Sequence, residues 1–428
     1  MNSSDSAKLF VGISQLVTLA GTEGPRRGSG MSDLSLFQEG AILVDQDRIL
    51  AAGSFREISA LAPARGARKV DLGGRVVLPG FVDSHTHPVF ALPRLRDFSL
   101  RITGVGYKEI AEKGGGILST VSTIRETSEP ELAEQFQERM NSFLECGTTT
   151  LEAKSGYGLD LHSELKILKA IARVASQGPL EVVSTLLGAH AVPVEYRYRR
   201  ADYIRLVAEE MIPSVVKHGL AEFVDVFCDK GYFTVLESEK ILKKALAVRL
   251  KVKIHADQLS HSGGAKLAAR LKAVSADHLD HVTSKDMAAL KKSGTIPVLI
   301  PASNFFLGTK YAPARRLISQ DLPVALATDF NPGTCPCWNM QMVLSIACTQ
   351  MKMTVEEAVT ATTLNAAYAV GRGDRLGSLV AGKQADFVVM DVEDYREIPY
   401  YFGVNHCVMT VKKGQVVYDK LGLASQRS

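Results

Sequence analysis

The sequence predicts an α/β protein: a (β/α)8 (TIM) barrel with a small β-sandwich domain that the N- and C-terminal segments form together. Eight short apolar segments alternate with helix-patterned segments through the middle of the chain. Strand-like segments occur before and after them, and polar residues collect where the eight central segments end. Strand–helix alternation favours a parallel sheet, and eight repeats over roughly 250 residues fit a closed barrel better than an open sheet.

The N-terminal part of the small domain is expected over residues 1–75. Segments 8–20, 40–54 and 67–80 alternate apolar and polar residues and are separated by Gly, Asp and Pro. This pattern is typical of antiparallel strands joined by turns.

The barrel, expected over residues 76–375, is the larger of the two predicted domains. Helices cover a parallel barrel, so its strands should be buried, and the central segments carry almost no charge before their last two or three positions. Segments 129–147 and 160–178 have apolar residues at i, i+3 and i+4 and end in glycine, which predicts helices. The expected strands are 76–87, 147–156, 181–190, 222–229, 250–257, 274–280, 295–303 and 322–330.

The C-terminal part of the small domain is expected over residues 376–428. Segments 377–392 and 407–420 repeat the alternating texture of the N-terminal segments. We therefore expect both ends of the chain to share one β domain.

Composition excludes several classes of protein. The net charge of +4 arises from 50 basic and 46 acidic residues that are scattered along the chain, so we expect no nucleic-acid partner. Six cysteines are too few for a disulfide framework, which favours reduced thiols and a cytoplasmic location. No apolar run approaches the ~18 residues of a membrane span, so we expect no membrane association. A homodimer is the expected assembly of such a chain.

Histidines and one aspartate collect at the expected strand ends. His85 and His87 are two residues apart, so their side chains point to the same face and can hold one ion. With His255 after the fifth strand and Asp329 after the eighth, they form a donor set that suits Zn²⁺ or Fe²⁺/Fe³⁺. A lone histidine at a strand end is more often a structural residue than a ligand. For His190 and His278, a structural role and a role as a ligand both stay open.

The chain resembles the amidohydrolase superfamily and, within it, the imidazolonepropionase family. The matching stretches cover nearly the whole chain and include "LPGFVDSHTHPVFALPRLRDF" and "GSLVAGKQADFVVMD". The histidine pair and the terminal aspartate occur in many amidohydrolases. By contrast, "KSGYGLDL", "HADQLS" and "TDFNPGT" are far more specific to imidazolonepropionases.

This resemblance implies hydrolysis of the ring amide of 4-imidazolone-5-propanoate to N-formimidoyl-L-glutamate, in histidine degradation. It implies one metal ion held by His85, His87, His255 and Asp329. The implied contacts to the substrate are Arg94, Tyr157, His190, Gln258, Asn331, Gly333 and Thr334.

The chemistry of these residues fits such a reaction. A bound metal lowers the pKa of its water toward ~7 and so supplies a nucleophile at neutral pH. Asp329 is expected to take the proton of that water and deliver it to the departing ring nitrogen, with His278 as a helper beside the metal. Arg94 can bind a propanoate carboxylate through two parallel hydrogen bonds. The expected partner is therefore a small molecule with a carboxylate tail.

The number of metal ions also follows from the sequence. Many amidohydrolases bridge two ions with a carboxylated lysine that ends the fourth strand. Here that strand ends in Cys228 and Asp229, and Lys230 lies one step into the loop. We expect one ion per subunit.

Two other classes of protein stay open. An aminohydrolase acting on a nucleobase-like or imidazole-like substrate would carry His-x-x-Glu after the fifth strand, whereas this chain has Gln258 three residues after His255. A glutamine amide positions substrate but cannot act as a general acid, which leaves the proton donor undetermined. A non-catalytic scaffold paralogue should have lost a metal ligand, and all four are present.

Overall fold

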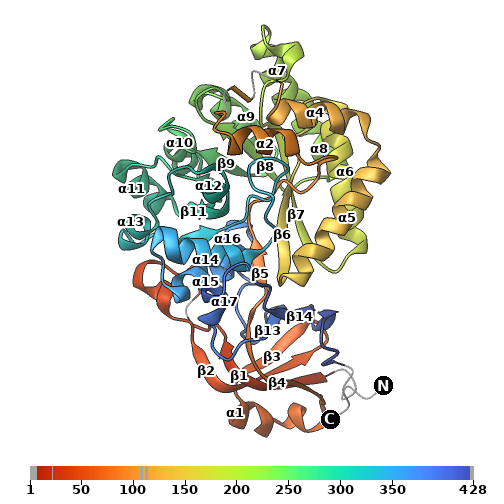
Figure 1. Ribbon diagram of the computed structural model, residues 1–428, viewed down its shortest axis with the longest axis vertical. Helices are drawn as coiled ribbons and strands as arrows, with labels where there is room; N and C mark the ends of the chain where they lie inside the picture. Colours follow the sequence, from red (N-terminus) through yellow and green to blue (C-terminus); the bar gives the residue numbers. More distant parts are fainter. Residues whose placement is uncertain (1–6, 22, 107–108, 111–113, 425–428) are drawn as a thin grey trace.

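The structure is a computed structural model that describes residues 7–21, 23–106, 109–110 and 114–424. Two sheets organise it, an eight-stranded barrel surrounded by helices and a seven-stranded sheet below it (Figure 1). The chain belongs to the α/β class, and the predicted barrel and the β domain shared by both chain ends are confirmed; the strands expected to form a β-sandwich belong to one continuous sheet.

The barrel strands follow one another in chain order around the axis, and every pairing between neighbours is parallel. Each lies within a segment for which the sequence predicts a strand. They are β5 (Phe81–Asp83), β6 (Thr148–Lys154), β7 (Glu181–Ala189), β8 (Phe223–Cys228), β9 (Lys251–Ala256), β10 (Ser275–His278), β11 (Ile296–Leu299) and β12 (Ala325–Leu326).

Residues just beyond the last and first strands close the barrel. Asp329 N donates to His85 O at 3.0 Å, and His87 N donates to Phe330 O at 2.8 Å. Thr86 and Phe330 form an isolated parallel bridge there. The seam between β12 and β5 therefore runs through the predicted metal ligands.

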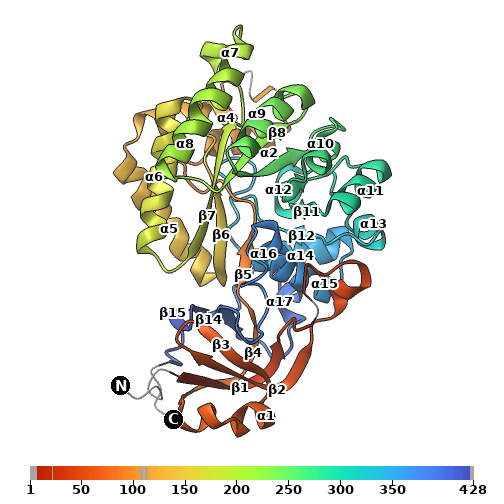
Figure 2. The same cartoon turned by 180° about the vertical axis from the view of Figure 1, so that it is seen from behind.

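Helices pack around the barrel, as Figure 2 shows from behind. Asp160 caps α6 by accepting from Ser163 N, and Gly178 ends it, as the sequence pattern predicts. The helices are α2 (Leu95–Ile102), α4 (Ile117–Glu126), α5 (Glu129–Glu145), α6 (Leu161–Gln177), α7 (Arg200–Arg205), α8 (Ile212–His218), α9 (Val235–Ala247), α10 (Gly264–Leu271), α11 (Ser284–Ser293), α12 (Pro301–Leu307), α13 (Ala314–Ser319), α14 (Met340–Met351), α15 (Val355–Thr362), α16 (Leu364–Ala369) and α17 (Glu397–Tyr400).

The small domain is one sheet of strand order β15-β14-β13-β4-β1-β2-β3. Strands from both ends of the chain share one core. In it, the rings of Phe10 and Phe387 meet edge to face at 4.8 Å, although the strands that carry them are not neighbours in the sheet. The strands are β1 (Ala7–Val17), β2 (Leu36–Asp45), β3 (Arg48–Ser54), β4 (Arg68–Pro79), β13 (Phe387–Met390), β14 (Cys407–Lys412) and β15 (Gln415–Asp419).

Two details of the sequence prediction were wrong. β1 and β4 pair in parallel, because α1 (Phe55–Ala60) and the turn after it carry the chain back across the sheet. The expected first barrel strand also starts later than residue 76. At Gly80 the chain passes from the small sheet to the barrel, and a Cβ there would lie 2.3 Å from Thr149 Cγ2, so glycine permits the crossing.

The charge-free character expected for the barrel strands also holds only in part. Glu152, Asp225 and Lys253 lie inside β6, β8 and β9 and are fully buried. They are tolerated because they pair with one another and with neighbouring charged groups.

The structure bears on some of the remaining expectations from the sequence and leaves others as predictions. In the described part of the chain, no helix is long and apolar enough to span a bilayer. All six cysteines are free thiols. The cytoplasmic location, the homodimer, the lack of a nucleic-acid partner and the domain limits stay predictions; β4 of the small sheet runs through residue 75.

Candidate metal and active site

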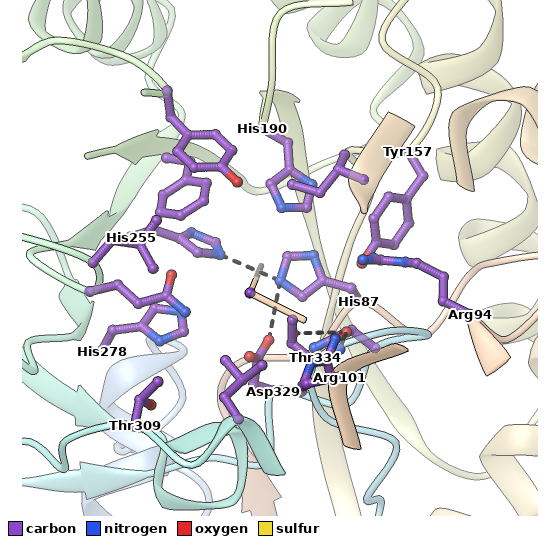
Figure 3. Close-up of a pocket in the computed structure, with 18 of the residues that line it drawn as sticks. His87, Arg94, Arg101, Tyr157, His190, His255, His278, Thr309, Asp329 and Thr334 are labelled. Atoms are coloured by element: carbon purple, nitrogen blue, oxygen red, sulfur yellow. Dashed lines mark hydrogen bonds and ion pairs between the residues drawn. The ribbon is translucent and has the colours of Figure 1, made fainter. Parts of the chain in front are cut away.

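Three imidazoles and one carboxylate converge at the mouth of the barrel, where Figure 3 shows His87, His255 and Asp329 pointing toward one another. His87 Nε2 lies 3.3 Å from His85 Nε2 and 3.4 Å from His255 Nε2. Asp329 Oδ1 lies 3.5 Å from His87 Nε2 and 3.7 Å from His85 Nε2. All four side chains are buried.

These distances are in the range expected for donor atoms that could share one metal ion. Ligand atoms that bind zinc at about 2.0–2.1 Å in a tetrahedron stand about 3.3–3.4 Å apart. His85, His87 and His255 also form a group whose ligand atoms lie within 4.8 Å of one another, as a shared ion requires. The geometry supports a metal site; that these residues are its ligands stays our proposal.

Carboxylates lie behind two of the imidazoles. His85 Nδ1 is hydrogen-bonded to Asp277 Oδ2 at 2.6 Å, and His255 Nδ1 lies 2.9 Å from Asp225 Oδ2 without hydrogen-bond geometry. A proton on His85 Nδ1 leaves the Nε2 lone pair of that ring free for a metal. Burial lowers the pKa of His85 well below its usual value, so this imidazole is neutral, as a ligand must be.

Asp329 and His278 occupy unusual backbone conformations at adjoining positions of the site. Their φ angles are 58° and 78°, a region that is costly for residues other than glycine and that concentrates at functional sites. Burial raises the pKa of Asp329 to about 7, against the opposing effect of His255. The ligand atoms of His278, His85 and Asp329 lie within 4.8 Å of one another, so His278 adjoins the site as predicted.

A cavity of about 360 Å³ opens from these residues toward solvent. Every predicted substrate contact except Gly333 lines it. The sequence analysis assigned no role to several other lining side chains, which come from β8, from helices and from loops: Arg101, Ile117, Phe227, Tyr232, Leu307 and Thr309.

Arg94 stands across the cavity from the metal ligands, next to Tyr157 (Figure 3). Its Nη2 donates to Tyr157 Oη at 3.4 Å, and its Nε donates to Thr120 Oγ1 at 3.0 Å. A Cβ on Gly333 would lie 2.4 Å from Arg94 Cζ, so the glycine makes room for the guanidinium. The sequence did not identify Thr120, which lies on α4.

His190 is held in one tautomer. Its Nδ1 lies 2.9 Å from Gly156 O, and because a carbonyl only accepts, Nδ1 must carry the proton. Burial lowers the pKa of His190 to about 3. The ring is therefore neutral, and its Nε2 accepts a hydrogen bond and cannot donate one to an oxyanion.

The turn after Asp329 uses its own polar groups. Asn331 Oδ1 accepts from Gly333 N at 2.9 Å and Thr334 N at 2.7 Å. Asn331 Nδ2 donates to Asp329 O at 2.7 Å. These backbone N–H groups thus build the turn that follows Asp329.

The sequence matches a family model described as "Amidohydrolase family" over residues 76–417. Among curated proteins, it is 47% identical to the imidazolonepropionase of Solibacter usitatus over 97% of this chain and 99% of that protein. It is 43% identical to the imidazolonepropionase of Alkaliphilus metalliredigens over 96% of this chain and 98% of that protein.

Among solved structures, the fold is similar to that of an atrazine chlorohydrolase from Arthrobacter aurescens complexed with zinc. The TM-score is 0.71 with 16% sequence identity, over 96% of this chain and 95% of that one. At this identity, the likeness concerns the fold.

Proposed function

This chain belongs to the amidohydrolase family, and we propose that it hydrolyses the ring amide of 4-imidazolone-5-propanoate to N-formimidoyl-L-glutamate, a step of L-histidine degradation. The two imidazolonepropionases to which it is similar over nearly their whole length support this substrate. One structural observation carries the proposal: the side chains of His87, His255 and Asp329, which converge with His85, line the same cavity as the buried Arg94. The cavity thus combines a place for a hydrolytic metal with a place for a carboxylate.

The proposed cofactor is one Zn²⁺ or Fe²⁺/Fe³⁺ ion per subunit, held by His85, His87, His255 and Asp329. Three imidazoles and one carboxylate suit both metals, and the zinc-bound neighbour of the same fold makes zinc the first metal to test. When bound, the ion supplies a nucleophile at neutral pH by lowering the pKa of water. Lys230, the lysine nearest the end of β8, is exposed, which supports a single ion.

Arg94 is proposed to bind the propanoate tail and thereby orient the ring toward the metal ligands. Tyr157 adjoins the guanidinium, and Thr120 fixes its Nε. A guanidinium has further N–H donors in a planar fork that matches a carboxylate. Gln258, Asn331 and Thr334 are the other proposed substrate contacts, whereas Gly333 lies outside the cavity lining and makes room for the guanidinium.

Asp329 is proposed as the general base. Its carboxylate takes a proton from the attacking water and delivers it to the ring nitrogen that departs. His278, beside it, is proposed to stabilise the oxyanion through an N–H group. His190 Nε2 is an acceptor, so it is proposed to receive a hydrogen bond from an N–H of the substrate ring.

The residues of the site also distinguish the proposed hydrolysis of a ring amide from the two alternative functions. An aminohydrolase would need an acid where this chain has Gln258, whose amide does not exchange protons. A scaffold paralogue has no need for four buried metal-binding groups within ion-sharing distances, and here they converge.

The test is ultraviolet monitoring of imidazolone propanoate, made freshly from urocanate by urocanase, with metal analysis of the same sample. We expect loss of the imidazolone absorbance in proportion to enzyme and about one ion per chain. Loss no faster than spontaneous decay would refute the function. A metal content near two ions per chain would refute the single-ion site.

The base is tested separately with Asp329→Asn. General acid–base catalysis contributes about 10²–10⁴-fold, so kcat should fall at least a hundredfold in samples with verified metal content. An Asp329→Asn enzyme that holds metal and turns over at nearly the wild-type rate would contradict the role of Asp329.

A further inference from the structure

We propose that Lys154 is a positioning residue for the metal site. Its ammonium is a built-in cation that holds Asp225 and Asp277 in place behind the imidazoles of His85 and His255. This inference rests on the metal site proposed above, but not on the identity of the substrate.

Lys154 is the last residue of β6 and is fully buried within the barrel. Its Nζ donates to Glu152 Oε1 and to Asp225 Oδ2, both at 2.8 Å, and lies 3.9 Å from Asp277 Oδ2. A buried ammonium is stable only when such partners surround it. Burial alone would lower the pKa of Lys154, but Asp225, Glu152 and Asp277 raise it above its usual value.

The carboxylate oxygens that face Lys154 are the same atoms that face the imidazoles. Asp225 Oδ2 lies 2.8 Å from Lys154 Nζ and 2.9 Å from His255 Nδ1. Asp277 Oδ2 lies 2.6 Å from His85 Nδ1. One ammonium therefore adjoins the carboxylates that lie behind two of the proposed metal ligands.

The two carboxylates lie close enough to repel each other. Ligand atoms of His85, Asp225 and Asp277 lie within 4.8 Å of one another, close enough to form a cation site themselves. Like charges so close in a buried region repel strongly. The ammonium of Lys154 lies 2.8 Å from Asp225 Oδ2 and 3.9 Å from Asp277 Oδ2, so its charge offsets this repulsion.

Lys253 contributes in a different way. Its Nζ donates to Ser84 O at 2.6 Å and lies 3.3 Å from Glu152 Oε1 and 3.9 Å from Asp277 Oδ2. Its hydrogen bond thus supports the backbone that leads into His85. Both carboxylates behind the imidazoles adjoin Lys154, which makes Lys154 the residue to test.

The experiment compares full-length Lys154→Met with wild type. Zinc affinity is measured by competition with a chelator, and the ligand geometry by the visible spectrum of the Co²⁺-substituted protein. Because loss of groups that orient metal ligands costs about 10–100-fold in affinity, we expect zinc binding to weaken by that factor and the Co²⁺ bands to shift.

Lys412→Met is the matched control. Lys412 is also a buried ammonium, 2.6 Å from Asp386 Oδ2, and it contacts Thr150 at the opposite end of β6. Its loss removes a buried ion pair far from the mouth of the barrel, so zinc affinity and the Co²⁺ spectrum should stay at wild-type values. Equal weakening of zinc binding in both variants would overturn the specific role of Lys154.

A folded Lys154→Met protein with zinc affinity within twofold of wild type and an unchanged spectrum would also overturn the proposal. If this variant does not fold, Lys154→Gln decides, because it retains a hydrogen-bond donor without the charge; an unchanged zinc affinity there rejects the role. These readouts do not depend on turnover. A protein that loses zinc affinity with Lys154 but never consumes imidazolone propanoate would refute the proposed substrate while the role of Lys154 stands.

Discussion

His190 illustrates, at the scale of single residues, how one buried hydrogen bond determines what a side chain can do. The sequence places it at a strand end but leaves open whether it donates or accepts. Its contact with Gly156 O and its pKa of about 3 make Nε2 an acceptor. Among the histidines of the site, the proposed donor to the oxyanion is therefore His278.

A substitution at Gly333 tests the carboxylate site at the same scale. An added Cβ would lie 2.4 Å from Arg94 Cζ, so Gly333→Ala should displace the guanidinium while the fold persists. Hydrogen bonds to charged groups contribute about 1.5–3 kcal/mol each, so we expect KM to rise about 10–100-fold with a smaller effect on kcat. Steady-state kinetics measure this split.

The control for Gly333→Ala is Gly30→Ala, since no atom lies within 4 Å of the Cβ it would add. Its KM should equal that of wild type. An unaltered KM in Gly333→Ala would mean that Arg94 does not bind the carboxylate in the observed position.

Individual residues differ in how far the sequence reveals them. His85, His87, His255 and Asp329 could be predicted because each follows an apolar run at the active face of a barrel. Lys154 could not, because a charge within a buried strand has no meaning until its partners on other strands are known. A signal was nevertheless present, since Glu152 and Lys154 are two residues apart and therefore lie on the same face of one expected strand.

The loop between β6 and α6 shows how one element positions a binding residue of another. Glu164, in the first turns of α6, is fully buried. Its carboxylate accepts from Gly156 N at 3.0 Å, Gly158 N at 2.8 Å and Leu159 N at 2.9 Å. These bonds surround Tyr157, so the helix holds the loop that carries it.

We expect Glu164→Gln to loosen this loop. The amide presents one acceptor and one donor where three N–H groups need acceptors, so hydrogen bonds that contribute about 1.5–3 kcal/mol each are lost. KM for imidazolone propanoate should rise several-fold, while zinc affinity stays unchanged because the metal ligands lie on other elements. Glu131→Gln, an exposed glutamate in the first turn of α5, serves as the control. A rise in KM equal in both variants would contradict the role of Glu164.

At the scale of elements, the sequence predicts that a strand exists more reliably than it predicts where the strand begins and ends. All eight barrel strands lie where apolar runs occur, because burial on both faces leaves a clear pattern. The limits of β5 and the parallel pairing of β1 with β4 were missed. Both depend on how the two sheets meet, and local periodicity carries no information about that contact.

The whole molecule is joined by an ion cluster at the closed end of the barrel. Lys412 of β14 lies 2.6 Å from Asp386 Oδ2 and 3.4 Å from Glu181 Oε2, at the start of β7. Glu181 also pairs with Arg372 and Arg375. The cluster binds the small sheet to the end of the barrel that faces away from the site.

Breaking this cluster should affect stability alone. Removal of one partner of a buried ion pair costs about 3–5 kcal/mol, so Lys412→Met should lower the free energy of unfolding by about that amount. Thermal and denaturant unfolding measure the loss, and kcat and KM at a permissive temperature should match wild type. Destabilisation below 1 kcal/mol would show that the cluster does not hold the domains together.

Metal removal tests how the site and the barrel depend on each other. The proposed ligands His85, His87 and Asp329 come from both sides of the seam between β5 and β12, where β12 has only two residues. A bound ion therefore adds a link across the weakest strand pairing, and ligands that bind only the folded state stabilise it. Removal of the metal by a chelator should lower Tm and raise amide hydrogen exchange in residues 84–90 and 325–334. Exchange in β7 and β8, on the far side of the barrel, is the internal control and should change little. A uniform increase in amide hydrogen exchange, or no increase near the seam, would show that the ion does not stabilise the closure of the barrel.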